Sequence, residues 1–176
     1  MKRFLRHCLI YSIFLLSINK AFADSVIMGI NLELVGSKQN TFDGGLGLTI
    51  GYEFSEFNGW NYGGQLSYLN GWNEKQDLID AGDVAYNSMS LYATARHHDL
   101  PIMFKAGIVD TDYQVLLIDN SQIFQREHKL GAGIGMSLAF EFEPFVLELL
   151  DYKRIWVGNT WFNSYGISIT VPGLFY

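Results

Sequence analysis

Two segments of this sequence alternate, residue by residue, between large apolar side chains and small or polar ones. In 45–54 (GLGLTIGYEF) the even positions carry leucine, isoleucine or an aromatic residue, and the odd positions carry glycine, threonine or glutamate. The same alternation runs through 130–142 (LGAGIGMSLAFEF). Successive side chains of a β-strand point to opposite faces, so this period predicts strands with one bulky apolar face and one small face.

Six further segments are compatible with the same pattern, which gives eight expected strands. They are 25–35, 60–69, 85–96, 101–109, 145–156 and 161–175. The segment 145–156 fits least well, because Asp151 and Lys153 fall on the face that begins as apolar at Phe145. An even number of antiparallel strands is typical of a closed, up-and-down membrane barrel.

The connections between these segments alternate in length. Three are short, and three are longer and mostly polar. The short ones are 55–59, 97–100 and 143–144, and the longer ones are 36–42, 70–84 and 110–127. Only 157–160 departs from this alternation, because it is short where a longer loop is expected. Short turns at one end and longer loops at the other are characteristic of transmembrane barrels, whose termini lie at the periplasmic, short-turn end.

The volume of the large side chains decides which face of the sheet lies inside. An eight-stranded barrel has an interior just wide enough to be filled by side chains, and the bulky residues of eight strands exceed that space. The bulky face must therefore point outward, where it is stable only in lipid. We expect an all-β fold, an eight-stranded antiparallel up-and-down transmembrane β-barrel. The alternative is a soluble barrel with an aromatic core.

Aromatic residues lie toward both ends of the expected strands. Tyr52, Phe54, Trp60 and Tyr62 flank the first short turn, and Tyr68, Trp72, Trp156 and Trp161 lie toward the longer loops. Two rings of aromatic side chains are typical of the two interfaces of a membrane barrel.

The N-terminus has the pattern of a secretory signal. A basic stretch precedes an apolar run over 8–18, and small residues follow at Ala21 and Ala23, the expected cleavage site. The run is shorter than the roughly 20 apolar residues that a transmembrane helix needs. We therefore expect 1–23 to be removed and 24–176 to form the barrel domain.

Charge and cysteine content narrow the range of functions. The single cysteine, Cys8, lies in the expected signal, so the remainder can hold neither a disulfide nor a cysteine-ligated metal. Residues 24–176 carry eight Lys and Arg against eighteen Asp and Glu, a net charge of −10. A strongly acidic chain repels phosphate, so we expect no nucleic-acid partner.

The sequence from about Ser25 to Tyr176 resembles the small outer-membrane β-barrel superfamily that includes OmpA- and OmpX-type proteins. The similar stretches are GGLGLTIGYEF (44–54), LPIMFKAGI (100–108), HKLGAGIGMSLAFEFEP (128–144) and GISITVPGLFY (166–176). The resemblance implies a bacterial outer-membrane location after export to the periplasm. It implies as partners the lipid bilayer, lipopolysaccharide and the outer-membrane assembly machinery. An aromatic C-terminus is the assembly signal of such proteins. Here Phe175 is in phase with the outward residues of the last strand and Tyr176 is not.

Five charged residues fall on the small, inward face near the short-turn end of five different strands. They are Glu53, Arg96, Lys105, Glu141 and Glu148. Because unpaired charge in a narrow interior is costly, we expect a hydrogen-bonded salt-bridge cluster. It would either plug the interior or gate a narrow pore, and the small bore favours the plug. Glu33 lies nearer the outer end and is not included.

We expect no metal and no cofactor. His97 and His98 share a short turn with Asp99, and His128 lies at a loop edge, without the further ligands that a metal needs. Loop acids could bind calcium, but they lack EF-hand spacing. These acids are Asp77, Asp80, Asp83, Asp110, Asp112 and Asp119.

No catalytic residues are expected. Some eight-stranded outer-membrane barrels modify lipid A with a histidine and a serine, but the comparable strand, 145–156, contains neither. His128 with Ser121 or Ser164 is a conceivable pair that the spacing does not demand. We expect an integral outer-membrane protein with a structural, adhesive or host-interaction role. A lipid A-modifying enzyme and a narrow ion-conducting pore are the alternatives.

The longest expected loop, 110–127, contains an apolar stretch, YQVLLI (113–118). This stretch could extend the neighbouring strands above the membrane and leave an exposed edge. Such an edge would be a candidate protein-partner site by strand addition.

Overall fold

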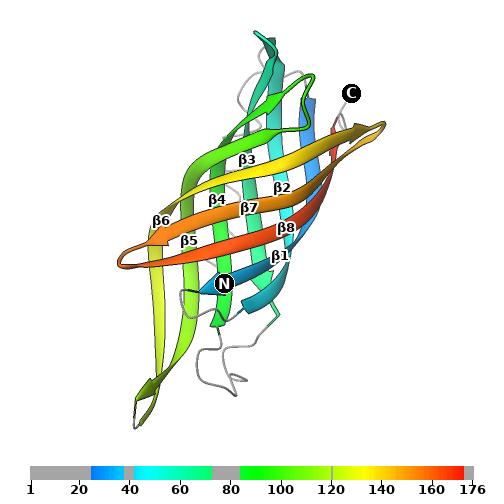
Figure 1. Ribbon diagram of the computed structural model, residues 1–176. Coiled ribbons are helices and arrows are strands. Elements are labelled where there is room, and N and C mark those ends of the chain that lie inside the picture. The colour runs from blue at the N-terminus through cyan, green and yellow to red at the C-terminus, as the bar shows by residue number, and fades with distance from the viewer. Residues whose placement is uncertain (1–24, 38–41, 73–83, 120, 173–176) are drawn as a thin grey trace, which may run out of the picture.

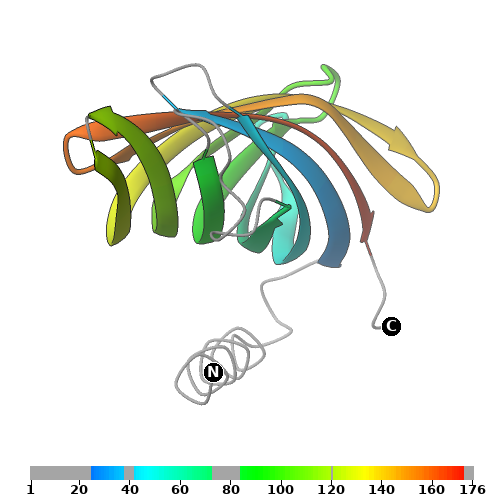
Figure 2. The same ribbon diagram turned by 90° about the horizontal axis from the view of Figure 1, so that it is seen from below.

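The computed structural model describes residues 25–37, 42–72, 84–119 and 121–172, which form eight strands (Figure 1). They are β1 (Ser25–Ser37), β2 (Phe42–Phe57), β3 (Trp60–Gly71), β4 (Val84–His97), β5 (Met103–Asp119), β6 (Ser121–Phe142), β7 (Phe145–Val157) and β8 (Thr160–Pro172). Each strand pairs antiparallel with the next, and β8 pairs with β1 to close the barrel. The expected fold class is confirmed. Figure 2 shows how strongly the strands curve.

The short turns lie together at one end of the barrel, which is the upper end in Figure 1. They join β2 to β3, β4 to β5 and β6 to β7. In the β2–β3 turn, Asn58 and Gly59 have φ angles of 54° and 79°. Positive φ at both central residues is the geometry of the two-residue hairpin turn that matches strand twist, and Asn-Gly is the pair that adopts it most readily.

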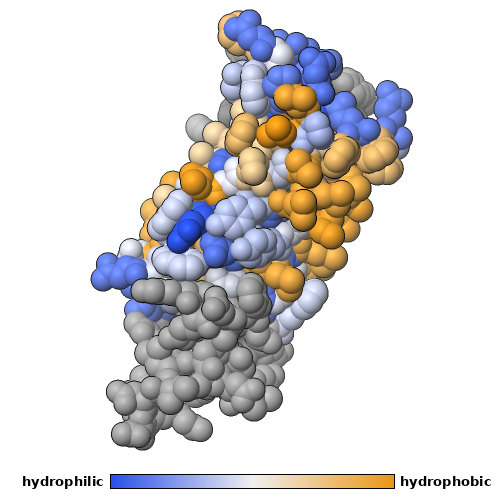
Figure 3. Space-filling model, in the orientation of Figure 1, coloured by the Kyte–Doolittle hydropathy of each residue, from blue (hydrophilic) through white to orange (hydrophobic). Residues whose placement is uncertain are grey.

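The large apolar side chains cover the outside of the barrel, as expected. On β2 the side chain of Leu48 is 61% exposed, whereas its neighbour Thr49, which faces inward, is 9% exposed. Figure 3 shows these apolar residues gathered on the barrel wall, with hydrophilic residues at the short-turn end. An apolar exterior of this extent is stable in lipid and not in water. Among the described residues, no helix is long and apolar enough to cross a membrane.

A β-bulge in β7 corrects one expectation from the sequence. Leu149 and Leu150 both face outward, Leu150 has a φ of 52°, and the pairing with β8 shifts between Glu148 and Asp151. One extra residue in a strand reverses the inside–outside phase of everything that follows. Asp151 and Lys153 therefore point into the barrel, and the expectation that they interrupt the apolar face was wrong.

Residues 110–127 form paired strands and not the expected loop. β5 and β6 continue to pair from Asp110 opposite Leu130 to Asp119 opposite Ser121. The apolar 113–118 segment finds a backbone partner in β6. The resulting hairpin reaches beyond the other strands at the lower left of Figure 1. The alternative expectation of strands extended above the barrel agrees with this arrangement.

Some sequence-based expectations lie outside the described residues. They concern the signal segment with Ala21 and Ala23, the loop acids Asp77, Asp80 and Asp83, and the C-terminal Phe175 and Tyr176.

Candidate functional site

The middle of the barrel interior holds a network of five buried charged residues from three strands. They are Glu33 on β1, Lys105 on β5, and Glu148, Asp151 and Lys153 on β7, with side chains at most 7% exposed. We call them the central network. The Nζ of Lys105 lies 2.5 Å from Glu148 Oε2 and 3.0 Å from Asp151 Oδ2. The Nζ of Lys153 lies 2.6 Å from Glu33 Oε1 and 3.3 Å from Asp151 Oδ2. Asp151 therefore joins the two lysines.

Polar side chains of neighbouring strands complete the central network. Ser164 on β8 donates to Glu33 Oε2 at 2.6 Å, and Ser137 on β6 donates to Glu148 Oε2 at 3.1 Å. Asn31 on β1 donates to Glu33 Oε1 at 2.5 Å. Gly47 leaves room for this amide, because a Cβ there would lie 2.4 Å from Asn31 Nδ2. These bonds satisfy most of the hydrogen-bonding capacity that the buried charges need, and Asp151 Oδ1 is left without a partner in the described part of the chain.

A second group of charges lies at the short-turn mouth. Arg96 on β4 donates from Nε and Nη2 to Glu53 Oε1 at 2.9 and 2.6 Å. Its other terminal nitrogen forms an ion pair with Glu141 on β6, whose side chain is 57% exposed. We call these three residues the mouth cluster. Because water reaches Glu141, this group is less isolated from solvent than the central network.

The outer end of the interior is filled by apolar side chains, which we call the outer plug. Its members are Val35, Leu69, Tyr86, Tyr92, Val109, Tyr113, Ile155, Val157 and Phe162. The Phe162 ring centroid lies 5.0 Å from that of Tyr86 and 4.9 Å from that of Tyr113. The Tyr113 hydroxyl donates to Glu127 Oε2 at 2.6 Å.

Very little space remains between these layers. A cavity of about 10 Å³ lies among residues of the central network and its polar neighbours, including Gln65 and Tyr92. That volume is about what one water molecule needs. The interior of the described barrel is therefore packed, and its lysines and carboxylates are engaged with one another.

The structure brings the five sequence-predicted charges together in two groups. Glu53, Arg96 and Glu141 form the mouth cluster, and Lys105 with Glu148 belongs to the central network. Sequence reasoning missed the roles of Glu33, Asp151 and Lys153. The alternation that begins at Phe145 would place Asp151 and Lys153 on the lipid-facing side. These two charges were the sign in the sequence that the inside–outside alternation of β7 changes phase.

The histidines do not assemble a catalytic or metal site in the described part of the chain. His97 Nδ1 accepts backbone hydrogen bonds from Asp99 and Leu100 within its turn. His128 lies 3.2 Å from Asp110, with both side chains exposed. Ser164 is fully buried against Glu33 inside the barrel. Within the described ranges, no three His, Cys, Asp or Glu residues are placed to hold a metal ion.

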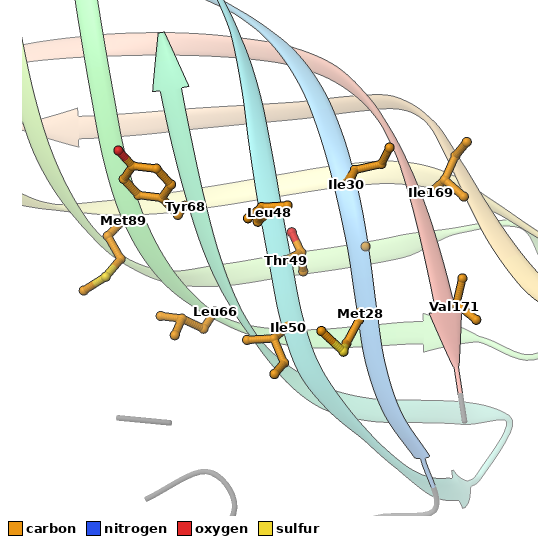
Figure 4. Close-up of a pocket in the computed structure, with 11 residues that line it drawn as sticks. Met28, Ile30, Leu48, Thr49, Ile50, Leu66, Tyr68, Met89, Ile169 and Val171 are labelled. Carbon is orange, nitrogen blue, oxygen red and sulfur yellow. The ribbon is translucent and has the colours of Figure 1, made fainter. Parts of the chain in front are cut away.

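A shallow groove of about 710 Å³ lies on the outer wall over β8, β1, β2, β3 and β4 (Figure 4). Its lining is mostly aliphatic or methionine side chains, such as Met28, Leu48, Leu66 and Ile169. It carries no ionisable side chain except the phenol of Tyr68. Because it lies in the apolar exterior, its surface is suited to hydrocarbon and not to catalysis.

No protein-family model and no curated protein matches this sequence. Among solved structures, the chain is similar to Ail, the attachment invasion locus protein of Yersinia pestis, with 18% identity and a TM-score of 0.51 over 85% of this chain and 97% of Ail. It is also similar to the N-terminal β-barrel domain of Pseudomonas aeruginosa OprF, with 17% identity and a TM-score of 0.51 over 82% and 96%. The fold is that of the small eight-stranded outer-membrane β-barrels.

Proposed function

We propose that this chain is an integral protein of the bacterial outer membrane that acts at the cell surface through the extended β5–β6 hairpin. The export signal over 1–23 and an assembly signal at Phe175 or Tyr176 belong to this proposal. In this orientation the short turns and both termini lie in the periplasm. The apolar exterior and the similarity to outer-membrane barrels support the location.

The proposal rests on the β5–β6 hairpin, because neither of its outer edges has a neighbouring strand among the described residues. Pairing of β4 with β5 ends at Val84 opposite Val115, and pairing of β6 with β7 ends at Ala132 opposite Trp156. Beyond these points, the backbone groups on the outer edges of 116–119 and 121–131 have no partner strand among the described residues. An unpaired edge can accept an extended peptide as an additional strand.

An attachment role agrees best with this arrangement. The packed interior disfavours a pore, and the separation of His128 from Ser164 disfavours lipid A hydrolysis by that pair. Ail, which has a similar fold, is the attachment invasion locus protein of Yersinia pestis. We propose the same class of role here, with a protein of another cell as the partner.

Shortening the hairpin tests this function. Replacing 115–125 by Asn-Gly joins Gln114 to Arg126, which are register partners, through a turn that suits a two-residue hairpin. This variant keeps Tyr113 and Glu127 and so keeps the outer plug. We expect bacteria that express the wild type to attach to cultured epithelial cells, and the variant to attach only at the level of an empty vector.

A heat-modifiability gel provides the control, because the shortened protein should still migrate as a folded barrel before boiling. Equal attachment by the wild type and a folded, shortened variant would dismiss the hairpin as the binding element. Placing Asn-Gly in the β7–β8 turn at 158–159 changes another outer connection and should leave attachment unaltered.

A further inference from the structure

Arg154 is a charged residue on the lipid-facing side of β7. After the bulge at Leu150 the even-numbered residues of this strand point outward, so Arg154 lies between Tyr152 and Trp156 on the outer wall. Its partner on β6 is Ile134, whose side chain is 54% exposed on the same apolar surface. Figure 3 shows hydrophilic and weakly polar residues over β7 and β8, beside the apolar surface of the barrel.

Two tryptophan rings hold the Arg154 guanidinium. Its central carbon lies 4.3 Å from the ring centroid of Trp161 and 5.9 Å from that of Trp156. Both distances are within the range of a cation–π interaction. These ring contacts do not satisfy the N–H hydrogen-bond donors of the guanidinium.

No protein acceptor is recorded for these donors in the described part of the chain. The Nε atom of Arg154 is buried and has no hydrogen-bond partner, and Arg154 forms none of the salt bridges found among the described residues. An arginine in this position has a full positive charge and five donors directed along a rigid plane. Because Nε is buried, the two terminal nitrogens are the donors that remain for an anion with two oxygens in one plane.

The depth of Arg154 in the membrane indicates where that anion comes from. β7 begins at Phe145 beside a short turn, and Arg154 is its tenth residue. A tilted transmembrane strand crosses the hydrocarbon in about 9–11 residues, so the guanidinium lies at the outer interface. The cost of a lipid-facing arginine is about 0–1 kcal/mol at that level, against about 2–4 kcal/mol at the midplane.

We propose that Arg154, held between Trp156 and Trp161, binds a phosphate of a lipid headgroup in the outer leaflet. In a bacterial outer membrane this lipid is lipid A, and the identification rests on the location and orientation proposed above. Arginine binds phosphate through two parallel N–H···O bonds, which are stronger than bonds between neutral groups. The tryptophans place the guanidinium at the headgroup level, as aromatic residues do at membrane interfaces.

Native mass spectrometry of the folded full-length barrel in detergent tests this site. The protein is titrated with bis-phosphorylated lipid A or with the same lipid A after removal of both phosphates. We expect the wild type to bind the phosphorylated form about tenfold more tightly, which corresponds to one charge-assisted pair of hydrogen bonds. Arg154→Gln should bind the two forms equally.

Lys129→Gln is the matched control, because it removes one positive charge at the same end of the barrel from a lysine that already pairs with Glu127. This variant should keep the wild-type preference. A preference that persists in Arg154→Gln, or no preference in the wild type, would overturn the proposal. Competition by inorganic phosphate at equal concentration would also overturn the assignment to a lipid headgroup.

Binding of phosphorylated lipid A can be measured independently of the proposed attachment through the β5–β6 hairpin. The variant with Asn-Gly in place of 115–125 should bind phosphorylated lipid A like the wild type, because its β7 and β8 are unchanged. A barrel that fails to promote attachment can therefore still show the Arg154-dependent preference, and the two proposals can fail separately.

Discussion

At the scale of single residues, the barrel interior depends on matching each buried charge with an opposite one. Lys153 is the connection between Glu33 and Asp151, and its side chain is 7% exposed. Removing one member of a buried ion network leaves the other members charged and desolvated, which costs more than the network contributes as a whole. The stability of this barrel should therefore respond strongly to single changes in the central network.

Lys153→Met should lower the free energy of unfolding by about 3–5 kcal/mol, because it leaves Glu33 without a cation and Asp151 with Lys105 alone. Urea unfolding of the barrel in lipid vesicles, followed by tryptophan fluorescence, measures this loss. The double variant Lys153→Met with Glu33→Gln should recover part of it, since one unpaired charge is removed. A loss below about 0.5 kcal/mol would show that the central network does not stabilise the fold.

Arg96→Met provides a comparison within the same interior. Its partners Glu53 and Glu141 are 17% and 57% exposed, so water reaches both more readily than the central network once the arginine is gone. We expect a loss of about 1 kcal/mol, as for ion pairs that water reaches. A loss as large as that of Lys153→Met would contradict the difference in solvation between the mouth cluster and the central network.

At the scale of elements, the bulge in β7 determines which side chains enter the interior. Before Leu150 the inward residues are Val146 and Glu148, and after it they are Asp151, Lys153 and Ile155. If β7 continued in regular alternation and did not form the bulge, Asp151 and Lys153 would face lipid and Leu150 would face the interior. A charged residue at the middle of the lipid face costs several kcal/mol, so the bulge is required by the sequence that follows it.

Deleting Leu150 removes the extra residue, so Asp151 then follows Leu149 in regular alternation and the later residues of β7 keep their faces. This variant should fold into lipid vesicles and show the faster-migrating, protease-resistant form on an unboiled gel. Deleting Leu149 and Leu150 together should prevent folding, because Asp151 would follow Glu148 and every later residue of β7 would change face. Efficient folding of the double deletion would show that the phase of β7 does not control folding.

Most of the strands could be predicted from the sequence, because alternation of apolar and small residues indicates both a strand and the face on which each side chain lies. Eight strands, their order and the outward position of residues such as Leu48 and Ile134 were predicted and are confirmed. The bulge in β7 was missed, because its position depends on how β7 pairs with the neighbouring strands, and a single sequence does not give that pairing. The outer plug was missed for a related reason. Tyr86 and Phe162 are large, and only the assembled barrel shows that the interior has room for them at its outer end.

At the scale of the whole molecule, three layers close the interior from end to end. They are the mouth cluster, the central network and the outer plug. A cavity of about 10 Å³ lies beside the central network. Ions need a continuous path of water, and a space for about one water molecule does not provide one. The closed interior leaves the outer wall and the β5–β6 hairpin as the surfaces that can interact with partners.

Planar-bilayer recordings should accordingly show no steady conductance above that of lipid alone. The same preparation should be fully heat-modifiable, so that a silent record reflects folded protein. Removing charge from the central network by the double variant Lys105→Met with Glu148→Gln should also give no conductance, since the outer plug remains. A stable ohmic current from the wild type would contradict the closed interior.

The central claim is that the bulky face of the strands contacts lipid. Nitroxide labels on single cysteines test it most directly, since 24–176 has no cysteine of its own. In vesicles, labels at Leu48, Ile134 and Ile167 should collide often with oxygen, which concentrates in hydrocarbon, and rarely with a water-soluble nickel complex. Labels at Asp99 and Asn159, in turns at opposite ends of the barrel, should show the reverse. Frequent nickel collisions at the three wall positions, or labels there that neither reagent reaches, would contradict a membrane-spanning barrel.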